Sequence, residues 1–451
     1  MKDRGINMIK VAKFGGSSVA DGNQFKKIKS IIQSDDTRQF VVVSATGKRF
    51  KDDNKVTDLL YLCHAHIKYG VSYDTIFSLI EDRYRSIKSD LNLNFDLENE
   101  FKIIRTKMNK DINLDYLVSR GEYLTACLMA EFLGFEMFDA KDFIIFDYDS
   151  NINFDKTKAA LENILKDHKK IVVPGFYGSL PNGVIKVMSR GGSDITGAIL
   201  ANLLNADVYE NWTDVSGILV ADPRIIENPK RINSITYNEL RELSYMGANV
   251  LHEEAIFPVK DKNIPINIRN TNEPSNPGTM IMENCDEIDK KNPPHFITGI
   301  AGKKNFTSIT IYKAHMSNDV GTVRRVLSVF EKFKLSIENI PSGIDSFSIV
   351  VSSEQIENCL YELIAEIKES VQPDSVKVAD KISLIATVGR GMSDRPGISG
   401  KLFAELGNNA INIRLINQGS DEINIIVGVE NKDFEKTIRV IYDRFIYQGE
   451  N

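Results

Sequence analysis

Short apolar runs that each end in a loop of small residues recur through the first 270 residues, and this alternation constrains the fold more than any other feature. Continuous apolar runs of this length are typical of strands buried in a parallel sheet. Helical patterns separate the runs, so the sequence predicts an α/β domain with a mainly parallel sheet, whose ligands bind outside the carboxyl ends of the strands. We expect the last run to be the final strand of the domain. The runs cover residues 9–14, 39–45, 170–176, 206–212 and 264–271.

The junction after the first run is a candidate anion site. Gly15 and Gly16 follow the strand, and Ser17 or Ser18 is expected to cap the helix that comes next. This arrangement brings backbone N–H groups and the positive end of a helix together, with the charge of Lys13 beside them. The same pattern also fits an ordinary strand–helix turn with a surface lysine. The chain holds no Gly-x-x-x-x-Gly-Lys-Ser/Thr motif, which disfavours a P-loop NTPase.

A second junction of the same kind follows residue 188. Gly191 and Gly192 lead through a Ser-Asp cap into a helix that extends to Leu204. Arg190 places a guanidinium, which binds carboxylates through two parallel donors, next to this helix start. The helix dipole stabilises the charge of Asp194, which is therefore suited to hold a lysine in place.

Glu122 lies in a helical stretch of otherwise small and apolar residues. A buried carboxylate without a partner is costly in free energy. We therefore expect Glu122 to be either paired or functional.

Length and charge exclude several classes of protein. A chain of 451 residues is expected to form about two to four domains. The net charge of -6 argues against a nucleic-acid-binding surface, and no apolar run approaches the roughly 18 residues of a membrane span. The N-terminus lacks the apolar core of a signal peptide, and the four cysteines lie far apart. We expect a cytoplasmic protein with reduced thiols and no metal site built from its own side chains.

An internal repeat organises the last third of the chain. Residues 316–321 (Met-Ser-Asn-Asp-Val-Gly) align without gaps on residues 392–397 (Met-Ser-Asp-Arg-Pro-Gly), and the register continues to Gly343 and Gly419. Each copy has the pattern of a strand, a helix, two strands and a helix, so the repeat predicts two similar α+β modules. The charged stretch at 283–294, which ends in two prolines, is the expected linker.

Five motifs in order make the first part of the chain similar to the aspartokinases of the amino-acid kinase family. The motifs are 13–19 (Lys-Phe-Gly-Gly-Ser-Ser-Val), 119–122 (Ser-Arg-Gly-Glu), 189–194 (Ser-Arg-Gly-Gly-Ser-Asp), 212–217 (Trp-Thr-Asp-Val-Ser-Gly) and 222–224 (Asp-Pro-Arg). The tail resembles a pair of ACT modules, the small-molecule sensing domains that follow the kinase domain in this family. The resemblance implies an amino-acid-kinase-like, mainly parallel sheet sandwiched by helices, followed by two ferredoxin-like α+β modules. The implied domains are the kinase domain at 8–292, a first module at 306–380 and a second module at 381–451, which is expected to recruit a strand from 296–311.

The resemblance also implies a reaction, the transfer of the γ-phosphoryl group of ATP, bound with Mg²⁺, to the β-carboxylate of L-aspartate. This is the first step in the synthesis of lysine, threonine and methionine, and the chain resembles the monofunctional members of the family rather than the fusions with homoserine dehydrogenase. Two alternatives stay open. One is another kinase of the same fold, acting on glutamate, acetylglutamate or a nucleotide, against which the motif at 119–122 and the ACT pair argue. The other is a degenerate kinase that only senses amino acids, against which the combination of Lys13, Arg190, Asp194 and Glu122 argues.

The functional positions of the family carry over onto the motifs. Lys13 is expected to stabilise the transferring phosphoryl group, while Asp194 organises the cations around it. The amides of Gly15 and Gly16 are expected to hold the phosphoryl oxygens. The expected aspartate-binding residues are Ser44, Thr57, Glu122 at the α-ammonium and Arg190 at the α-carboxylate. The expected nucleotide-binding residues are Lys13, Phe14, Gly15, Gly16, Thr213, Asp214, Leu219, Arg224, Asn249 and Val250.

Two residues depart from the pattern of the family. Asn249 stands where the family has a lysine that reaches the nucleotide phosphates, and Leu219 stands where an aromatic residue often faces the nucleotide. The missing positive charge is expected to come from another lysine. The candidates are Lys230, Lys260 and Lys262.

The repeat is expected to bind a regulatory amino acid and to join the chains into a homodimer or a dimer of dimers. Asp319 and Glu338 favour a ligand with a cationic side chain or ammonium, so lysine is the first expected inhibitor and threonine the second. If the modules serve only for dimerisation, neither amino acid will bind. The expected effector-binding residues are Met316, Asp319, Thr322, Val323, Ile337, Glu338 and Ser342.

Overall fold

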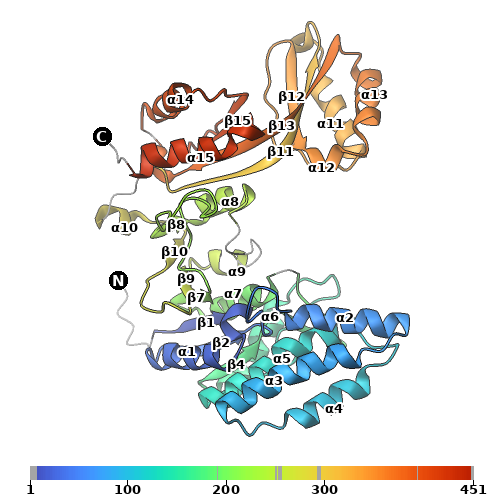
Figure 1. Ribbon diagram of the computed structural model, residues 1–451, viewed down its shortest axis with the longest axis vertical. Coiled ribbons are helices and arrows are strands. Elements are labelled where there is room, and N and C mark those ends of the chain that lie inside the picture. Colours follow the sequence, from blue (N-terminus) through green and yellow to red (C-terminus); the bar gives the residue numbers. More distant parts are fainter. Residues whose placement is uncertain are drawn as a thin grey trace. The chain divides into compact units, whose positions relative to one another are not determined.

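The structure is a computed structural model of the chain (Figure 1), and it describes residues 8–189, 191–248, 251, 256–291, 296–393 and 395–447. The described residues form two compact units. The first contains the residues up to Ile218, Asn233–Tyr237 and those from 251 to Cys285. The second contains Leu219–Ile232, residues 238–248 and those from Asp286 onward. The kinase domain expected at 8–292 thus includes segments that pack with the second unit, and its boundaries remain a proposal.

The core of the first unit is an eight-stranded sheet with the order β3-β4-β2-β1-β7-β9-β10-β8. Every neighbouring pair is parallel except β9 and β10, which confirms the mainly parallel sheet expected from the apolar runs. A separate hairpin pairs β5 (Tyr177–Ser179) with β6 (Ile185–Val187). The strands of the sheet are β1 (Lys10–Phe14), β2 (Arg38–Val43), β3 (Glu136–Met137), β4 (Ile171–Pro174), β7 (Val208–Thr213), β8 (Ser234–Thr236), β9 (Ile266–Asn270) and β10 (Thr279–Met282).

The expectation that the run at 264–271 is the last strand of the domain is wrong. β10 follows β9 and pairs with it in antiparallel orientation. The residues between them form a hairpin turn, in which Arg269 Nη2 donates to the carbonyl oxygen of Pro274 at 2.6 Å. Gly278 closes the turn in the left-handed region, with φ 71°. The turn residues at 272–278 therefore mark a hairpin here and not a domain boundary.

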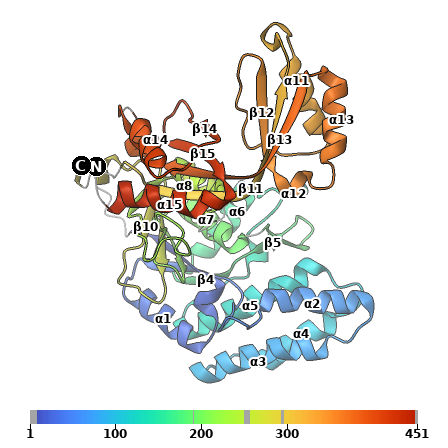
Figure 2. The same cartoon turned by 45° about the horizontal axis from the view of Figure 1, so that its top comes forward.

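Helices cover both faces of this sheet (Figures 1 and 2). Successive residues of a strand point to opposite faces. Accordingly, Tyr209 and Asn211 of β7 hydrogen-bond to α7, whereas Trp212 joins the apolar cluster that α1 to α5 form against the sheet. The helices are α1 (Gly22–Gln33), α2 (Val56–Tyr69), α3 (Asp74–Leu91), α4 (Leu97–Lys107), α5 (Leu114–Leu133), α6 (Phe154–Leu165), α7 (Gly192–Leu204) and α9 (Phe257–Lys260).

The start of α1 differs from the expectation. After β1 the chain makes a short 3-10 turn, η1 (Gly16–Val19), before the α-helix begins. The cap of α1 is Asp21, whose side chain accepts a hydrogen bond from the Gln24 amide at 2.9 Å. Neither Ser17 nor Ser18 therefore caps this helix, because Asp, an equally good cap, lies one turn further on.

The second unit is built on a five-stranded antiparallel sheet with the order β12-β11-β13-β15-β14. Residues 299–303 of β11 pair with the part of β13 that also pairs with β15, whereas residues 306–312 of β11 pair with β12. A segment that precedes the first repeat copy thus lies in the sheet of the second copy. The module boundaries at 306–380 and 381–451 remain proposals. The strands are β11 (Gly299–Tyr312), β12 (Ser346–Ser352), β13 (Ser375–Val388), β14 (Leu415–Asn417) and β15 (Asn424–Glu430).

The two repeat copies fold alike, which confirms the expected pair of α+β modules. α11 (Thr322–Lys332) and α14 (Ile398–Asn408) each have 11 residues and follow a short 3-10 turn. Their N-cap residues, Gly321 and Gly397, have φ 90° and 91°, a left-handed conformation that glycine adopts without strain. Figures 1 and 2 show α11 and α13 along one side of the sheet. The other helices are α8 (Tyr237–Tyr245), α10 (Asp286–Lys291), α12 (Ser353–Ile356), α13 (Leu360–Val371) and α15 (Phe434–Tyr442).

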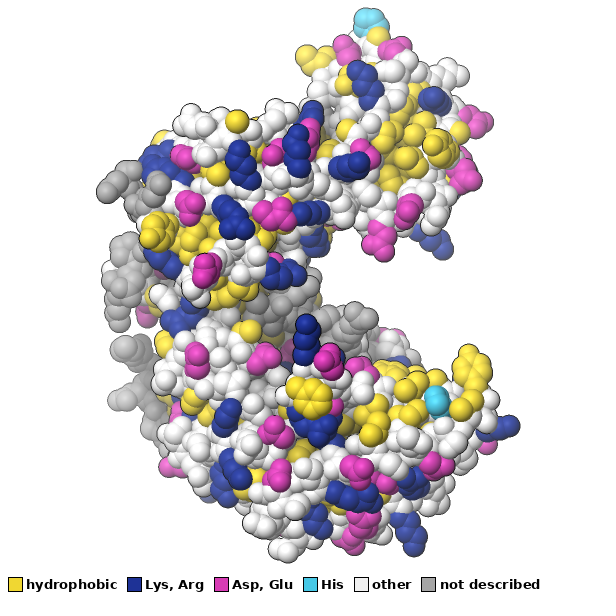
Figure 3. All heavy atoms as spheres, viewed as in Figure 1, with side chains coloured by type: hydrophobic (Ala, Val, Ile, Leu, Met, Phe, Trp, Pro, Cys, Tyr) yellow, Lys and Arg dark blue, Asp and Glu magenta, His cyan; other side chains and the backbone are white. Residues whose placement is uncertain are grey.

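The surface carries charges of both signs. Figure 3 shows Lys and Arg side chains interspersed with Asp and Glu over the visible face. This mixture fits the small net charge of -6. In the part of the chain that the structure describes, no helix has the length and apolar character needed to cross a membrane.

Candidate active site

A cleft of about 1110 Å³ opens at the carboxyl ends of β1, β2 and β7, where a parallel sheet presents its loops. Its walls come from the loops after β1 and β2, the first turn of α2, the start of α7 and the residues after β7. The cleft brings together nine of the residues expected from the sequence to be catalytic, substrate-binding or nucleotide-binding. They are Lys13, Gly15, Gly16, Ser44, Thr57, Glu122, Asp194, Thr213 and Asp214.

Lys13 is held in the cleft by Asp194. The Lys13 side chain leaves the sheet on the face that α7 covers, and its Nζ lies 2.5 Å from Asp194 Oδ1. Asn211 Nδ2 donates to the same oxygen at 2.9 Å, and the Tyr209 hydroxyl donates to the Asp194 carbonyl at 3.0 Å. Lys13 is 7% exposed. A nearly buried ammonium is thus fixed at the floor of the cleft.

The glycine turn after β1 offers fewer free amides than the sequence suggests. The Gly15 amide donates to the carbonyl oxygen of Trp212 at 3.0 Å, so the expectation that this amide holds a phosphoryl oxygen is not met. Within the described residues, the amides of Gly16 and Ser17 have no backbone or side-chain acceptor. These two donors, beside the Lys13 ammonium, form the part of the turn that can bind an anion.

Glu122 is buried without a partner for one of its oxygens. The side chain lies on α5 and is 4% exposed, and its Oε2 forms no hydrogen bond. Burial raises the pKa of the carboxyl to about 8, while a hydrogen bond from the Ala45 backbone opposes the shift. The sequence predicted that Glu122 is either paired or functional, and the residue lines the cleft with one oxygen that has no partner within the protein.

Four residues of the cleft with ionisable side chains were missed by the sequence reasoning. Lys48, Lys55, Asp58 and Tyr61 line it from the loop after β2 and the first turns of α2. Lys48 and Lys55 lie between Ser44 and Thr57, in a stretch dense in Lys, Arg and Asp, and the other two follow Thr57 in the chain. That position between two expected substrate-binding residues was the signal that could have revealed them.

Several expected nucleotide-binding residues lie elsewhere or outside the described residues. The Phe14 side chain points to the opposite face of the sheet, where its ring stacks on Trp212 with centroids 6.0 Å apart. Leu219 and Arg224 belong to the second unit, and Arg224 is exposed and paired with Asp222 at 2.5 Å. Arg190, Asn249 and Val250 lie outside the described residues.

The three lysines expected to replace the family's missing cation do not line the cleft. Lys262 Nζ donates to the carbonyl oxygen of Asn202 at 2.7 Å, at the end of α7. Lys230 belongs to the second unit, where its Nζ donates to the carbonyl oxygen of Ile446 at 2.8 Å. The ammonium of Lys260 lies 4.0 Å from a Glu283 oxygen. None of them is among the described residues of the cleft wall.

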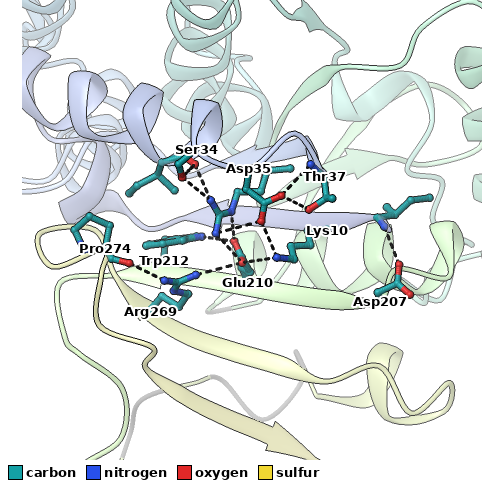
Figure 4. Close-up of polar contacts among 12 residues, drawn as sticks. Lys10, Ser34, Asp35, Thr37, Asp207, Glu210, Trp212, Arg269 and Pro274 are labelled. Carbon is teal, nitrogen blue, oxygen red and sulfur yellow. Dashed lines mark hydrogen bonds and ion pairs between the residues drawn. The ribbon is translucent and has the colours of Figure 1, made fainter. Parts of the chain in front are cut away.

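Behind the cleft, on the opposite face of the sheet, Glu210 is the centre of a buried polar cluster (Figure 4). Its carboxylate accepts from Arg38 Nε at 2.7 Å and from Trp212 Nε1 at 2.9 Å, and it lies 3.5 Å from Arg269 Nη1. The guanidinium carbons of Arg38 and Arg269 lie 5.3 Å and 4.5 Å from the centre of the Trp212 ring. The cluster fixes Trp212, whose carbonyl receives the Gly15 amide on the cleft side.

No group of three His, Cys, Asp or Glu side chains in the described ranges is arranged to hold a metal ion. Asp214 is exposed at the cleft, where its Oδ1 accepts from the Thr213 hydroxyl at 3.1 Å. Mg²⁺ commonly binds through one or two carboxylates together with the phosphates of a substrate. The donor set at this cleft fits a Mg²⁺ ion that is carried by a nucleotide.

In the second unit, Asp319 is already paired within the chain. Lys313 Nζ lies 2.5 Å and Arg325 Nη2 2.9 Å from its Oδ2, and these bonds hold the pKa of the carboxyl well below its usual range. The expectation that Asp319 is free to attract a cationic ligand is not met. The Glu338 carboxylate is hydrogen-bonded to Tyr245, and burial followed by this bond raises the pKa of that phenol to about 12.

A second cavity, of about 800 Å³, lies on the five-stranded sheet. Residues of β11, β13 and β14 line it, among them Thr310, Lys377 and Leu415. It includes none of the seven expected effector-binding residues.

Comparison with known proteins matches the chain to one family along nearly its whole length. A model of the amino acid kinase family matches residues 8–270, and a model of an ACT domain matches residues 385–445. Aspartokinase 3 of Bacillus subtilis (strain 168) is 36% identical over 452 residues, which cover 97% of this chain and 98% of that protein. The crystal structure of Clostridium acetobutylicum aspartate kinase is 49% identical and covers 97% of this chain and 100% of that chain, with a TM-score of 0.89. E. coli aspartokinase III in complex with lysine and aspartate, at 24% identity and a TM-score of 0.74, covers 97% of this chain and 99% of that chain and shares the fold.

Proposed function

Because this chain belongs to the amino acid kinase family and, within it, to the aspartokinases, it phosphorylates the β-carboxylate of L-aspartate with ATP, and we propose that the cleft of the first unit is where this transfer occurs. One observation carries the proposal. Lys13, fixed by Asp194, and the buried carboxylate of Glu122, whose Oε2 has no hydrogen-bond partner, line the same cleft. A phosphoryl donor requires a cation that neutralises its charge, and an amino-acid acceptor requires an anion that binds its ammonium group.

On the phosphoryl side, the protein is proposed to position the transferring group and to neutralise its charge. Phosphoryl transfer leaves little covalent chemistry for the protein, because charge spreads over the oxygens of the transferring group. The Lys13 ammonium would face this charge, with Asp194 and Asn211 keeping it in place. The free amides of Gly16 and Ser17 would bind phosphate oxygens, a role that Gly15 fills only indirectly through its bond to Trp212.

On the acceptor side, Glu122 would bind the α-ammonium of aspartate. This contact supplies the partner that its buried Oε2 lacks. Ser44 and Thr57 line the same wall of the cleft and have hydroxyls that can hydrogen-bond a carboxylate. Arg190, outside the described residues, is assigned to the α-carboxylate from its motif alone.

Besides Lys13, Gly15 and Gly16, the cleft wall contains Thr213 and Asp214 of the expected nucleotide-binding residues, and we assign both to the nucleotide. The assignment of Leu219, Arg224, Asn249 and Val250 to the nucleotide rests on the resemblance of the motifs. Mg²⁺ would enter with ATP, held by the phosphates and by Asp214. When bound, the ion neutralises charge on the transferring phosphoryl group.

We also propose that lysine inhibits the enzyme through the second unit, with threonine as the second candidate. The match to an ACT domain supports a sensing role for the repeat. The effector site is assigned to Met316, Thr322, Val323, Ile337, Glu338 and Ser342, with Glu338 as the acidic group, since Asp319 is paired with Lys313 and Arg325. Assembly into a homodimer or a dimer of dimers and a cytoplasmic location are parts of the same proposal.

A coupled assay of ADP release tests the proposed function. The full-length protein is supplied with ATP, Mg²⁺ and either L-aspartate or L-glutamate. We expect turnover with aspartate and turnover at least about a hundredfold slower with glutamate, because one extra methylene misplaces the reacting carboxylate. Equal rates would indicate another kinase of this fold, and no turnover with either would indicate a sensor without activity. Removal of Mg²⁺ with EDTA should abolish turnover, and added MgCl₂ should restore it.

A further inference from the structure

The loop between β2 and α2 brings two unpaired cations to the cleft. Lys48 and Lys55 line the same cleft as Lys13. The Lys48 ammonium donates only to the carbonyl oxygen of Lys51, at 3.3 Å. Within the described residues, neither Lys48 nor Lys55 forms an ion pair with a carboxylate. Both side chains are exposed and are free to turn toward a ligand.

The same loop is anchored by a buried ion pair. Arg83 of α3 is 5% exposed and Asp53 of the loop is 8% exposed. Arg83 Nη2 lies 2.8 Å from Asp53 Oδ2, and Arg49 Nε donates to that oxygen at 2.8 Å. The hydrogen bonds from Arg49, followed by the charge of Arg83, hold the pKa of the Asp53 carboxyl well below its usual range. Removing an ion pair from water costs desolvation free energy, which offsets the attraction between the two charges. The consequence for the loop is therefore that the pair fixes its position.

The anchor connects the loop to the glycine turn after β1. Arg83 Nη1 donates to the carbonyl oxygen of Gly47 at 2.8 Å, and the Gly47 amide donates to the carbonyl oxygen of Gly16 at 2.9 Å. A Cβ on Gly47 would lie 2.6 Å from the Gly16 carbonyl carbon, so the two turns touch through their backbones. Lys48 is the next residue. It therefore starts beside the free amides of Gly16 and Ser17.

Without Lys48 and Lys55, the described cleft wall has little positive charge to bind the anionic substrates. Asp194 and Lys13 neutralise each other at 2.5 Å. Of the remaining titratable Asp, Glu and Lys side chains in the described cleft wall, three are acidic and two, Lys48 and Lys55, are basic. Both substrates, a nucleoside triphosphate and a dicarboxylic amino acid, bring negative charge into the cleft. Two more cations in the cleft wall would offset charge that Lys13 alone cannot balance.

We propose that Lys48 and Lys55 bind the phosphate oxygens of the nucleotide and that the Asp53–Arg83 ion pair positions the loop that carries them. Lys48 and Lys55 thereby supply the positive charge that the family places at the position of Asn249. The inference rests on the proposed function, because it assigns the nucleotide to this cleft.

The first test removes the two ammonium groups and leaves the fold of the loop. In Lys48→Ala/Lys55→Ala we expect the KM for ATP and the Kd for ADP, measured by calorimetry, to rise about tenfold, whereas the KM for aspartate stays within about threefold. Lys51→Ala is the matched control, because Lys51 lies in the same loop, carries the same charge and is not part of the cleft wall. Equal values in the double variant and the control would overturn the assignment. A rise in the KM for aspartate alone would also overturn it.

Ionic strength gives an independent readout. The attraction between exposed lysines and phosphates is screened by salt over a Debye length of about 10 Å at 0.1 M. The KM for ATP of the wild type should therefore rise with KCl more steeply than that of Lys48→Ala/Lys55→Ala. Identical salt dependence in the two proteins would contradict a contact with the phosphates.

The positioning role of Arg83 is tested by a double-mutant cycle. Arg83→Met should raise the KM for ATP about tenfold in the wild-type background and have little further effect in Lys48→Ala/Lys55→Ala, because the lysines through which it acts are gone. Arg83→Lys should restore part of the loss. Equal effects in both backgrounds would show a merely structural role. Asp53→Asn, which keeps the shape of the side chain, repeats the test if Arg83→Met does not fold.

Binding of ADP separates the failure of this inference from the failure of the proposed function. If the wild type binds ADP with a Kd that depends on Lys48 and Lys55 but phosphorylates no aspartate, the proposed function fails and the lysine assignment stands. If the wild type phosphorylates aspartate and the Kd for ADP ignores both lysines, the lysine assignment alone fails.

Discussion

At the scale of single residues, the neighbours of Lys13 fix the position of its ammonium group. Its ammonium is 2.5 Å from Asp194 Oδ1, and Asn211 donates to that same oxygen at 2.9 Å. The position of the ammonium is therefore set before any substrate arrives, and no reorganisation is needed in the transition state.

Substitution of Lys13 should reduce the rate of chemistry rather than the affinity for aspartate. A unit charge pair at about 4 Å and an effective dielectric constant near 20 is worth roughly 4 kcal/mol, or about three decades of rate. We expect Lys13→Met to lower kcat by up to this factor, with the KM for aspartate changed by less than about fivefold. Steady-state kinetics with both substrates measure the two constants. A kcat within about threefold of the wild type would rule out a contact between Lys13 and the transferring group.

Glu122 makes the enzyme sensitive to pH. Its pKa is raised from 4.5 to about 8, with burial as the main cause, so the carboxylate that an ammonium needs is lost as the pH falls through about 8. We expect kcat/KM for aspartate to rise between pH 6 and pH 8, and Glu122→Gln to be slow at every pH and to lack this rise. A flat profile of the wild type over this range would contradict the assignment.

The same shift affects stability in the opposite direction. Because the folded protein binds this proton more tightly than the unfolded chain does, stability is lost as the pH rises from 4.5 to about 8. Glu122→Gln should therefore have a higher Tm than the wild type at pH 8 and a similar Tm near pH 5. Added aspartate should raise the Tm of the wild type only.

At the scale of elements, charged side chains connect the central strands on one face of the sheet, and the cleft opens on the other side. Glu210 contacts Arg38 of β2, Trp212 of β7 and Arg269 of β9, and it is 1% exposed. Trp212 connects the two faces, since its ring lies in this cluster and its carbonyl accepts from Gly15 at the cleft. The cluster thus supports the glycine turn from behind the sheet.

Loss of the Glu210 charge should destabilise the first unit strongly. Glu210→Gln removes the nearest carboxylate from the buried Arg38 and from the partly buried Arg269, and breaking a buried pair in this way costs about 3–5 kcal/mol. Denaturant unfolding of the full chain measures the change. Glu98→Gln is the matched control, because Glu98 pairs with Arg85 at an exposed site and should contribute only about 1 kcal/mol or less. Equal losses in the two variants would show that the buried cluster has no special role.

At the scale of the whole molecule, a kinase unit and a sensing unit share one chain in an interleaved order. Leu219–Ile232 and residues 238–248 lie within the kinase part of the sequence and pack with the second unit. In that unit, the buried carboxylate of Glu239 pairs with Arg390 Nη1 at 3.0 Å and accepts from the Thr298 hydroxyl at 2.6 Å. The chain therefore passes between the two units several times.

Regulation can be tested on the full chain. A ligand changes activity only if it binds one conformation better than another, typically by about 1–3 kcal/mol of coupling. We expect lysine to inhibit the wild type, and Glu338→Ala to relieve the inhibition while the uninhibited kcat stays nearly unchanged. Thr322→Ile, at the start of α11, should act in the same way. Calorimetry without lysine or threonine binding, together with activity that is flat in both, would leave the repeat as a dimerisation module.

The sequence by itself determined the features that depend on local pattern. The apolar runs define a mainly parallel sheet because burial on both faces demands continuous apolar strands. The repeat defines two similar modules, and Gly321 and Gly397 mark the same left-handed cap in each. The meeting of Lys13 with Asp194 followed from two glycine junctions at the same edge of one sheet.

Only the tertiary structure decided which of these groups are free to act. The Gly15 amide is occupied by Trp212, almost two hundred residues away in the chain, and the charge of Asp319 is neutralised by Lys313 and Arg325. Lys48 and Lys55, unremarkable in the sequence, reach the cleft because Arg83 fixes their loop from a different helix. A residue pattern specifies the local conformation and the face of an element on which a residue lies. The partner that occupies a polar group is brought to it only when the whole chain has folded.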